Sequence, residues 1–321
     1  MSDVYTVQYW WEWLIAAYLF LGGMGGGGMM VSYYFCCRKS EQKLAAISAI
    51  TSLIIVIVGV FFLILDLEKP EKFYLVFMSP HLNTRSMIFV GSSILTAFII
   101  FGLIYITSLE VKWPSLLGRI IPVLPWYGRG SVANLTGLLA AIAGFLTTFY
   151  TGVLIGILKS VPFWHTPALP LLFVASALST GVVGILLVND IYGFTRPKEE
   201  RHRYEEYCSI LGKWDAILIS IELLIVFTYL FIFSYGPREA ELSVQLLTAG
   251  ELAPYFIGGV ILMGLSIPLL LEYWHIMSEN RGRRASCAIP MVAAILVIVG
   301  GLILRYVILQ SGVMTIFLPP S

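Results

Sequence analysis

Three polar side chains within long apolar stretches of this sequence have the chemistry to hydrogen-bond a ligand oxygen within a membrane. Tyr18, Tyr150 and Arg305 each stand inside a stretch long enough to cross a membrane, where a polar group is so costly that function is the default hypothesis. At about 1.5 Å per residue they lie roughly 13, 12 and 9 Å below the same membrane face. Their hydroxyl and guanidinium groups could hydrogen-bond a carbonyl or phenol oxygen.

Each of these three residues also has a purely structural interpretation. A tyrosine in a membrane helix usually packs its ring and bonds its hydroxyl to a backbone carbonyl. Arg305 could extend to the interface or pair with a carboxylate. Their shared depth favours the functional interpretation, and that depth depends on where the spans begin and end.

Further candidates surround the same outer face. Trp164 and His165 follow one span in the segment KSVPFWHT, and His81 lies in a long loop after another. An imidazole titrates near neutral pH, so His81 or His165 could exchange protons with a bound ligand. Both histidines could equally be ordinary interfacial loop residues.

A proton path can also be drawn from titratable side chains. Asp66 and Arg85 would close the site from above, while Glu222, Asp190 and Glu272 lie toward the inner face. Carboxylates within a membrane protein can relay protons. These three could instead cap helices or pair with arginines of the loops.

Apolar stretches predict the elements that must position these groups. The chain is 58% hydrophobic and only 12% charged, which indicates an all-α integral membrane protein. We expect one transmembrane domain of eight helices, which could divide into two four-helix bundles. The expected spans are 9–35, 44–65, 86–108, 131–158, 167–190, 214–235, 254–277 and 288–311.

The first span is unusual for its glycines. The segment Trp10–Phe35 begins with aromatic rings suited to the membrane interface and contains six glycines between Gly22 and Gly28. Small residues let helices approach closely. The glycines therefore predict tight helix packing or, alternatively, a helix that walls a ligand cavity.

Positive charge predicts the orientation. Loops one, three, five and seven carry 14 Lys and Arg residues, whereas loops two, four and six carry 5. The positive-inside rule then puts both termini on the outer side. The first span lacks a basic leader and a cleavage site, so we expect it to be retained.

Several kinds of site are disfavoured. The four cysteines include no C-x-x-C pair, which argues against an iron–sulfur cluster or structural zinc within this chain. The histidines provide no pair of haem ligands on facing helices. A net charge of +1 and the lack of a large basic patch argue against nucleic acid binding.

Taken together, several segments resemble the membrane subunits of the polysulfide reductase family, the NrfD/PsrC type. The first helix contributes W-x-W followed by its glycine run. The other matching segments, in the order expected of the family, are Leu65–Tyr74, Ser79–Ser92, Phe149–Gly156, Pro162–Gly181 and Gly300–Ile308.

The resemblance implies two four-helix bundles, a quinone site near the outer face, and no haem or iron–sulfur cluster of the subunit's own. It implies a bound quinone such as menaquinone, an extracytoplasmic iron–sulfur partner, and in many members a molybdenum or tungsten catalytic subunit. Tyr150 corresponds to the tyrosine that hydrogen-bonds quinone. Where the family's polysulfide reductase subunit has an Asn and a His on the first helix, this chain has Ile15 and Tyr18.

We therefore expect a quinone-reactive anchor subunit of a respiratory oxidoreductase, not catalytic by itself, in the cytoplasmic membrane of a prokaryote. Tyr150 and Tyr18 would hold the two ends of the headgroup, with Trp164 nearby. Arg305 would stabilise negative charge on a half-reduced quinone or on Asp66. Proton translocation would be an additional activity. Two other functions fit the residues: a secondary transporter and a haem-bearing quinol subunit.

Overall fold

The computed structural model describes most of the chain. The described residues are 4–8, 11–39, 41–67, 69–72, 74–75, 86–111, 124–194, 198–280 and 287–316. Two residues of the predicted site, His81 and Arg85, lie outside these ranges.

Eight helices of the described chain are long and apolar enough to cross a membrane, as predicted. Side chains on their outer faces are largely apolar and exposed, including Leu224 and Leu270 at 68%, as lipid requires. The helices are α1 (Trp13–Lys39), α2 (Gln42–Leu65), α4 (Met87–Ser108), α6 (Gly130–Gly156), α7 (Ala168–Phe194), α8 (Lys198–Ser234), η3 (Pro254–Ser266) continued by α10 (Ile267–Asn280), and α11 (Ala288–Gln310).

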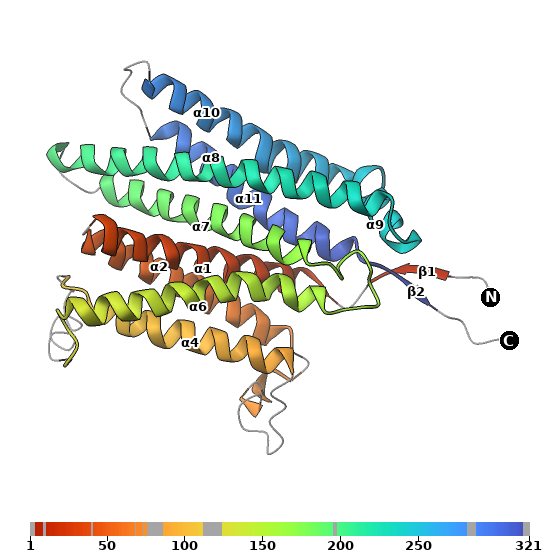
Figure 1. Ribbon diagram of the computed structural model, residues 1–321, viewed down its shortest axis with the longest axis horizontal. Coiled ribbons are helices and arrows are strands. Elements are labelled where there is room, and N and C mark those ends of the chain that lie inside the picture. Colours follow the sequence, from red (N-terminus) through yellow and green to blue (C-terminus); the bar gives the residue numbers. More distant parts are fainter. Residues whose placement is uncertain are drawn as a thin grey trace.

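These helices form two groups of four that lie side by side (Figure 1). The first bundle contains α1, α2, α4 and α6, and the second contains α7, α8, η3 with α10, and α11. Helices α1 and α7 pack against each other along the seam, and α11 also contacts α1. Helix α6 of the first bundle also packs against α7. The seam therefore joins the two bundles mainly through α1 and α6 of the first and α7 and α11 of the second.

The glycines of α1 are explained by close backbone contact. A Cβ added to Gly26 would lie 2.5 Å from the carbonyl oxygen of Gly144 on α6. A Cβ added to Gly27 would overlap the carbonyl oxygen of Ala177 on α7. A Cβ at Gly25 would meet Ser52 on α2 at 2.7 Å. The glycine run thus brings three helices onto three faces of α1, which confirms the packing interpretation.

The sixth and seventh spans differ from the prediction. Helix α8 begins at Lys198 rather than at 214, because the charged segment before the span continues the helix. The seventh span begins as a π-helix, η3, and then becomes the α-helix α10. Gly264 of η3 packs directly on Gly300 of α11, so glycines again permit the closest approach.

One end of the molecule carries the tails and three connections. There β1 (Val4–Val7) pairs antiparallel with β2 (Val313–Ile316), beside the short helix α9 (Arg238–Thr248). The connections after α2, α6 and α8 lie at this end, and those after α1, α4, α7 and α10 lie at the other (Figure 1). The 3₁₀ turn η1 (Pro70–Lys72) follows α2. We call these the terminal end and the opposite end.

Candidate functional site

The two predicted tyrosines come together near the terminal end of the first bundle. Tyr18 of α1 and Tyr150 of α6 are 1% and 6% exposed and lie close enough to interact electrostatically. Tyr18 shares a face of α1 with Gly22, whose missing side chain leaves room beside Thr147 and Thr151 of α6. The glycine therefore keeps the space next to Tyr18 open.

The two tyrosine hydroxyls differ in how they are satisfied. The Tyr150 hydroxyl donates to the backbone oxygen of Met87 at 2.7 Å, at the start of α4. A Cβ at Gly91 would overlap the Tyr150 ring, so glycine is needed there. The Tyr18 hydroxyl has no hydrogen-bond partner among the described residues. Polar groups of buried side chains normally have a partner, and a ligand oxygen would supply one to Tyr18.

Trp164 and His165 lie in the corner between α6 and α7 and hold the chain in place. The Trp164 ring is fully buried, stacks on Trp11 with ring centroids 5.5 Å apart, and donates its indole N–H to the carbonyl of Ile308 at 2.8 Å. The exposed His165 ring bonds the carbonyl of Gly156 at 2.7 Å, where α6 ends. Both contacts fix helix ends around the tyrosine pair.

Asp66 ends α2 at the same face. Its charge interacts with that of Glu12, just before α1. Partial burial, together with the negative charge of Glu12, raises the pKa of the Asp66 carboxyl. Asp66 is therefore better able to hold a proton than an ordinary surface aspartate.

Arg305 is fully buried in the second bundle and does not extend to the interface. Its guanidinium donates to the hydroxyl of Ser176 and to the carbonyl of Phe173, the latter at 3.1 Å, and lies 4.8 Å above the Phe173 ring. The carboxylate whose charge acts on it is Glu222 of α8, whereas Asp66, one of the two partners that we expected for Arg305, ends α2 in the first bundle. Ser176 also lies within hydrogen-bonding reach of Glu222.

The pairing of Arg305 with Glu222 corrects the predicted division into an outer and an inner set. Glu222 is only 2% exposed and belongs with Arg305 rather than with the inner carboxylates. Counting residues along the spans puts Arg305 and Glu222 at different depths, but the long Arg305 side chain bridges that distance. Arg305 Nη2 also lies 3.7 Å from the position that a Cβ on Gly23 would occupy. Gly23 directly follows Gly22, the glycine beside Tyr18 on α1.

A carboxyl pair follows toward the opposite end. Asp215 of α8 and Glu272 of α10 are 0% and 1% exposed and face each other within hydrogen-bonding reach. Ser179 donates to one oxygen of Asp215 at 2.5 Å. The other oxygen and both Glu272 oxygens have no donor among the described residues. Two facing acceptors require a shared proton, since otherwise their charges would repel in an apolar surrounding.

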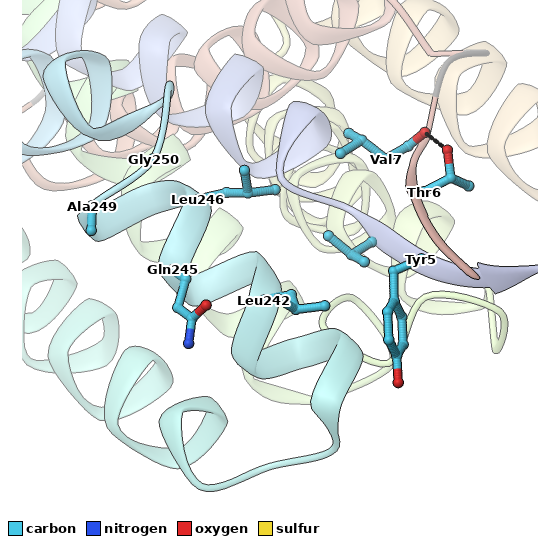
Figure 2. Close-up of a pocket in the computed structure, with 9 residues that line it drawn as sticks. Tyr5, Thr6, Val7, Leu242, Gln245, Leu246, Ala249 and Gly250 are labelled. Carbon is cyan, nitrogen blue, oxygen red and sulfur yellow. Dashed lines mark hydrogen bonds between the residues drawn. The ribbon is translucent and has the colours of Figure 1, made fainter. Parts of the chain in front are cut away.

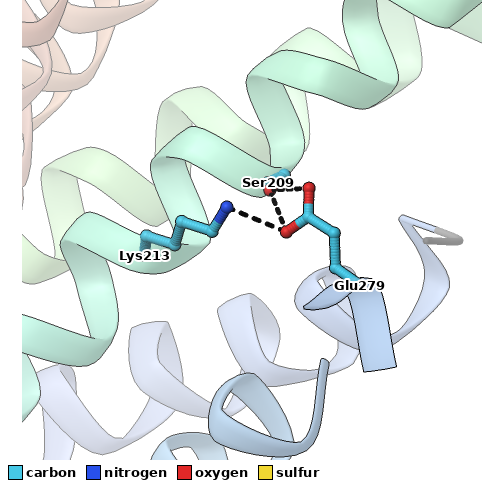
Figure 3. Close-up of polar contacts among 3 residues, drawn as sticks. All are labelled: Ser209, Lys213 and Glu279. Atoms are coloured by element: carbon cyan, nitrogen blue, oxygen red, sulfur yellow. Dashed lines mark hydrogen bonds and ion pairs between the residues drawn. The ribbon is translucent and has the colours of Figure 1, made fainter. Parts of the chain in front are cut away.

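At the opposite end the series reaches charged groups near the surface. His275, 3% exposed, lies one turn beyond Glu272 on α10 and interacts with Glu279 and Lys213. Figure 3 shows the Glu279 carboxylate bound by Lys213 at 2.9 Å and by the Ser209 hydroxyl. Polar groups thus extend from this surface ion pair to Arg305.

Sequence reasoning missed Asp215, Ser176, Ser179 and His275 as members of this series. Spacing could have revealed two of them, because Asp215 precedes Glu222 by seven residues and His275 follows Glu272 by three. Such intervals put side chains on one helix face. The serines gave no comparable signal. Asp190, predicted to join the path, instead neighbours Cys208 and Cys287.

A groove outside the helices lies at the terminal end. It has a volume of about 470 Å³ and runs between the strand pair and α9, with Tyr5, Val7, Leu242 and Leu246 among its lining residues (Figure 2). Tyr5 and Val7 are 38% and 39% exposed. The tails therefore present an apolar surface beyond the ends of the spans.

Comparison with known proteins gives a consistent result over nearly the whole chain. The sequence matches the family described as "Polysulphide reductase, NrfD" over residues 4–317. It is similar to the C subunit of polysulfide reductase from Wolinella succinogenes, with 29% identity covering 94% of each protein. It is also similar to protein NrfD of Escherichia coli, with 28% identity over 81% of this chain and 79% of that one. This multi-pass membrane protein therefore belongs to the NrfD polysulphide reductase family.

Proposed function

We propose that this chain binds quinone at the Tyr18–Tyr150 pair and passes its electrons to or from an iron–sulfur partner at the terminal end. The observation that carries the proposal is the Tyr18 hydroxyl, which belongs to a buried side chain close to Tyr150 and forms no hydrogen bond with the described residues. A quinone headgroup supplies carbonyl oxygens that accept hydrogen bonds. Membership of a family that includes a polysulfide reductase subunit supports a redox role.

The residues present suit a neutral aromatic ring. Tyr18 can donate its free hydroxyl, and Tyr150 can do so if its bond to Met87 is exchanged. Threonine methyl groups and glycines around Tyr18 provide an apolar, flat surrounding, and such surroundings favour binding of aromatic rings. Asp66, with its raised pKa, is positioned at the same face to accept or return protons.

The polar series of the second bundle would supply protons from the opposite end. In order, it contains the Glu279–Lys213 ion pair, His275, the Asp215–Glu272 pair, and Glu222 with Arg305. The closeness of Arg305 to Gly23 leads the series to the α1 face next to Tyr18. Proton uptake from one membrane side would thereby be coupled to chemistry near the other.

The terminal end would face outward and bind the partner. Charge asymmetry between the loops favours this orientation, and the apolar groove of Figure 2 offers a contact surface there. Leu246→Asp in the groove should weaken co-purification of the iron–sulfur subunit without changing the thermal stability of the isolated chain. Leu224→Asp on the lipid face would instead impair membrane insertion.

Quinol oxidation by the purified complex tests the proposed site. Tyr18→Phe and Tyr150→Phe should each lower kcat/KM by roughly threefold to tenfold, because one hydrogen bond to the ring is lost. Tyr105→Phe is the matched control, since Tyr105 is a buried tyrosine of the same bundle that bonds Ser32 instead. Oxidation at the wild-type rate by both Tyr18→Phe and Tyr150→Phe would reject the site.

A further inference from the structure

Three metal-binding side chains meet near the opposite end of the second bundle, where the polar series also begins, but none of them was assigned to that series. Asp190 of α7, Cys208 of α8 and Cys287, which precedes α11, place a carboxylate oxygen and two sulfurs within 4.8 Å of one another. Asp190 and Cys208 are 6% and 1% exposed. The three residues are far apart in the sequence, so no short motif such as C-x-x-C could have indicated a metal site here.

The carboxylate in this cluster is poorly satisfied by the protein. Oδ2 of Asp190 has no hydrogen-bond partner among the described residues. Oδ1 lies 3.9 Å from the Cys208 sulfur, and the Cys287 sulfur is also close to the carboxylate, but a thiol is a weak donor. A buried carboxylate without strong donors or a counter-charge costs several kcal/mol. A cation held between the three side chains would remove that deficit.

The separations suit a tetrahedral ion with sulfur and oxygen ligands. Zinc binds thiolate at about 2.3 Å and carboxylate at about 2.0 Å, which places the two ligand atoms roughly 3.5 Å apart in a tetrahedron. The observed Cys208–Asp190 separation of 3.9 Å needs only a small contraction. Two thiolates and a carboxylate select zinc or a similar borderline-soft ion over magnesium or calcium.

A neighbouring amide would support the sulfur ligand. The fully buried Asn189 donates from Nδ2 to the carbonyl of Tyr204 at 3.0 Å and lies 3.6 Å from the Cys208 sulfur. Hydrogen bonds from outside the ligand set orient and stabilise metal-bound thiolates. The Asn189 Oδ1 atom has no partner among the described residues, which leaves a further oxygen close to the cluster.

We propose that Asp190, Cys208 and Cys287 form a structural zinc site that ties the end of α7 and the start of α11 to α8. Binding would displace the protons of the two thiols, and water would complete the coordination. The ion would fix the end of the second bundle from which the polar series starts. This site is independent of the quinone proposal and stands or falls separately.

Metal analysis of the purified complex tests the site. After gel filtration with a weak chelator, we expect one zinc per chain, retained by Cys37→Ser and lost from Cys287→Ser. Cys37 is the matched control because its thiol lies elsewhere, 2.9 Å from Asn134. Absence of stoichiometric zinc, or equal zinc in both variants, would overturn the proposal.

A second measurement guards against a variant that does not fold. Titration of metal-free wild-type protein with Co²⁺ should give an intense thiolate-to-cobalt absorption band and visible bands of tetrahedral cobalt. Zinc added afterwards should remove them. No such bands would contradict the site, and mass spectrometric detection of a Cys208–Cys287 disulfide would assign the thiols to a redox pair instead.

Discussion

The two bundles bury different chemistry although they have the same number of spans. In the described helices of the first bundle, the buried polar side chains are serines and threonines, with Tyr18 and Tyr150 as the buried phenols nearest the terminal end. Buried charged or titratable side chains of the second bundle include Asp215, Glu222 and Arg305. Among the described residues, the first bundle therefore buries hydroxyl groups, whereas the second buries charged groups as well.

The difference follows from what each helix interface can tolerate. Glycines in α1 bring backbones so close that no long charged side chain fits between α1 and α6. In the second bundle, Ser176 and Ser179 of α7 provide hydroxyls that satisfy Arg305 and Asp215. A buried charge persists in a membrane only with such partners. The interior of the first bundle is therefore filled by close backbone packing, and that of the second bundle by charged side chains with polar partners.

Arg305→Met should produce the largest loss of stability and test the pairing. It leaves Glu222 buried without its counter-charge, which costs about 3–5 kcal/mol. Adding Glu222→Gln should restore much of the loss, as measured by thermal unfolding of the purified chain. A double variant no more stable than Arg305→Met alone would show that the two charges are not coupled.

Gly26→Ala tests the packing of the first bundle. Its methyl group would lie 2.5 Å from the Gly144 carbonyl, and such overpacking costs about 1–3 kcal/mol. The control is Gly258→Ala, whose methyl would meet nothing within 4 Å. The melting temperature should fall for the first variant only. Equal effects would mean that α1 and α6 are less tightly apposed than described.

Glu272 separates stability from proton transfer in the second bundle. Glu272→Gln should keep near-native thermal stability, because the amide can donate to Asp215 as the shared proton does. It should nevertheless slow proton uptake, since an amide does not titrate. Glu272→Leu removes the donor and should cost about 1–3 kcal/mol. Unchanged proton uptake by Glu272→Gln would limit Glu272 to a structural role.

The smallest expected effect lies outside both bundles, where α9 meets β2. The hydroxyl of Thr315 bonds the Glu239 carboxylate and lowers its pKa. A lowered pKa means that the bond contributes stability above the ordinary glutamate pKa of about 4 and loses it as the pH falls further. Thermal unfolding of Thr315→Val should therefore depend less on acid pH, while Thr228→Val should match the wild type.

Most of the fold could be predicted because lipid leaves little choice. A long apolar segment must be helical in a membrane, and seven of the eight predicted spans begin within four residues of the observed helices. The exception is α8, where charged residues before Lys213 gave no apolar signal although they continue the helix. The π-helical geometry of η3 likewise could not be predicted from the hydropathy of the sequence.

For the predicted site residues, positions along the helices were easier to predict than side-chain contacts. The similar depths of Tyr18 and Tyr150 below one membrane face agree with their closeness in the structure, because two residues at one level on packed helices can meet. Depth alone failed for Arg305, whose partner Glu222 was assigned to the other side. Side-chain length and helix rotation decide such contacts. Residue counting along a span gives neither.

Proton uptake per electron in proteoliposomes tests the division between the bundles most directly. The reconstituted complex would oxidise a short-chain quinol while pH is recorded on the side of the opposite end. We predict that Tyr18→Phe lowers electron transfer and proton uptake in parallel, whereas Glu222→Gln lowers the number of protons taken up per electron. An unchanged ratio in Glu222→Gln, with electron transfer unaffected by Tyr18→Phe, would contradict the account.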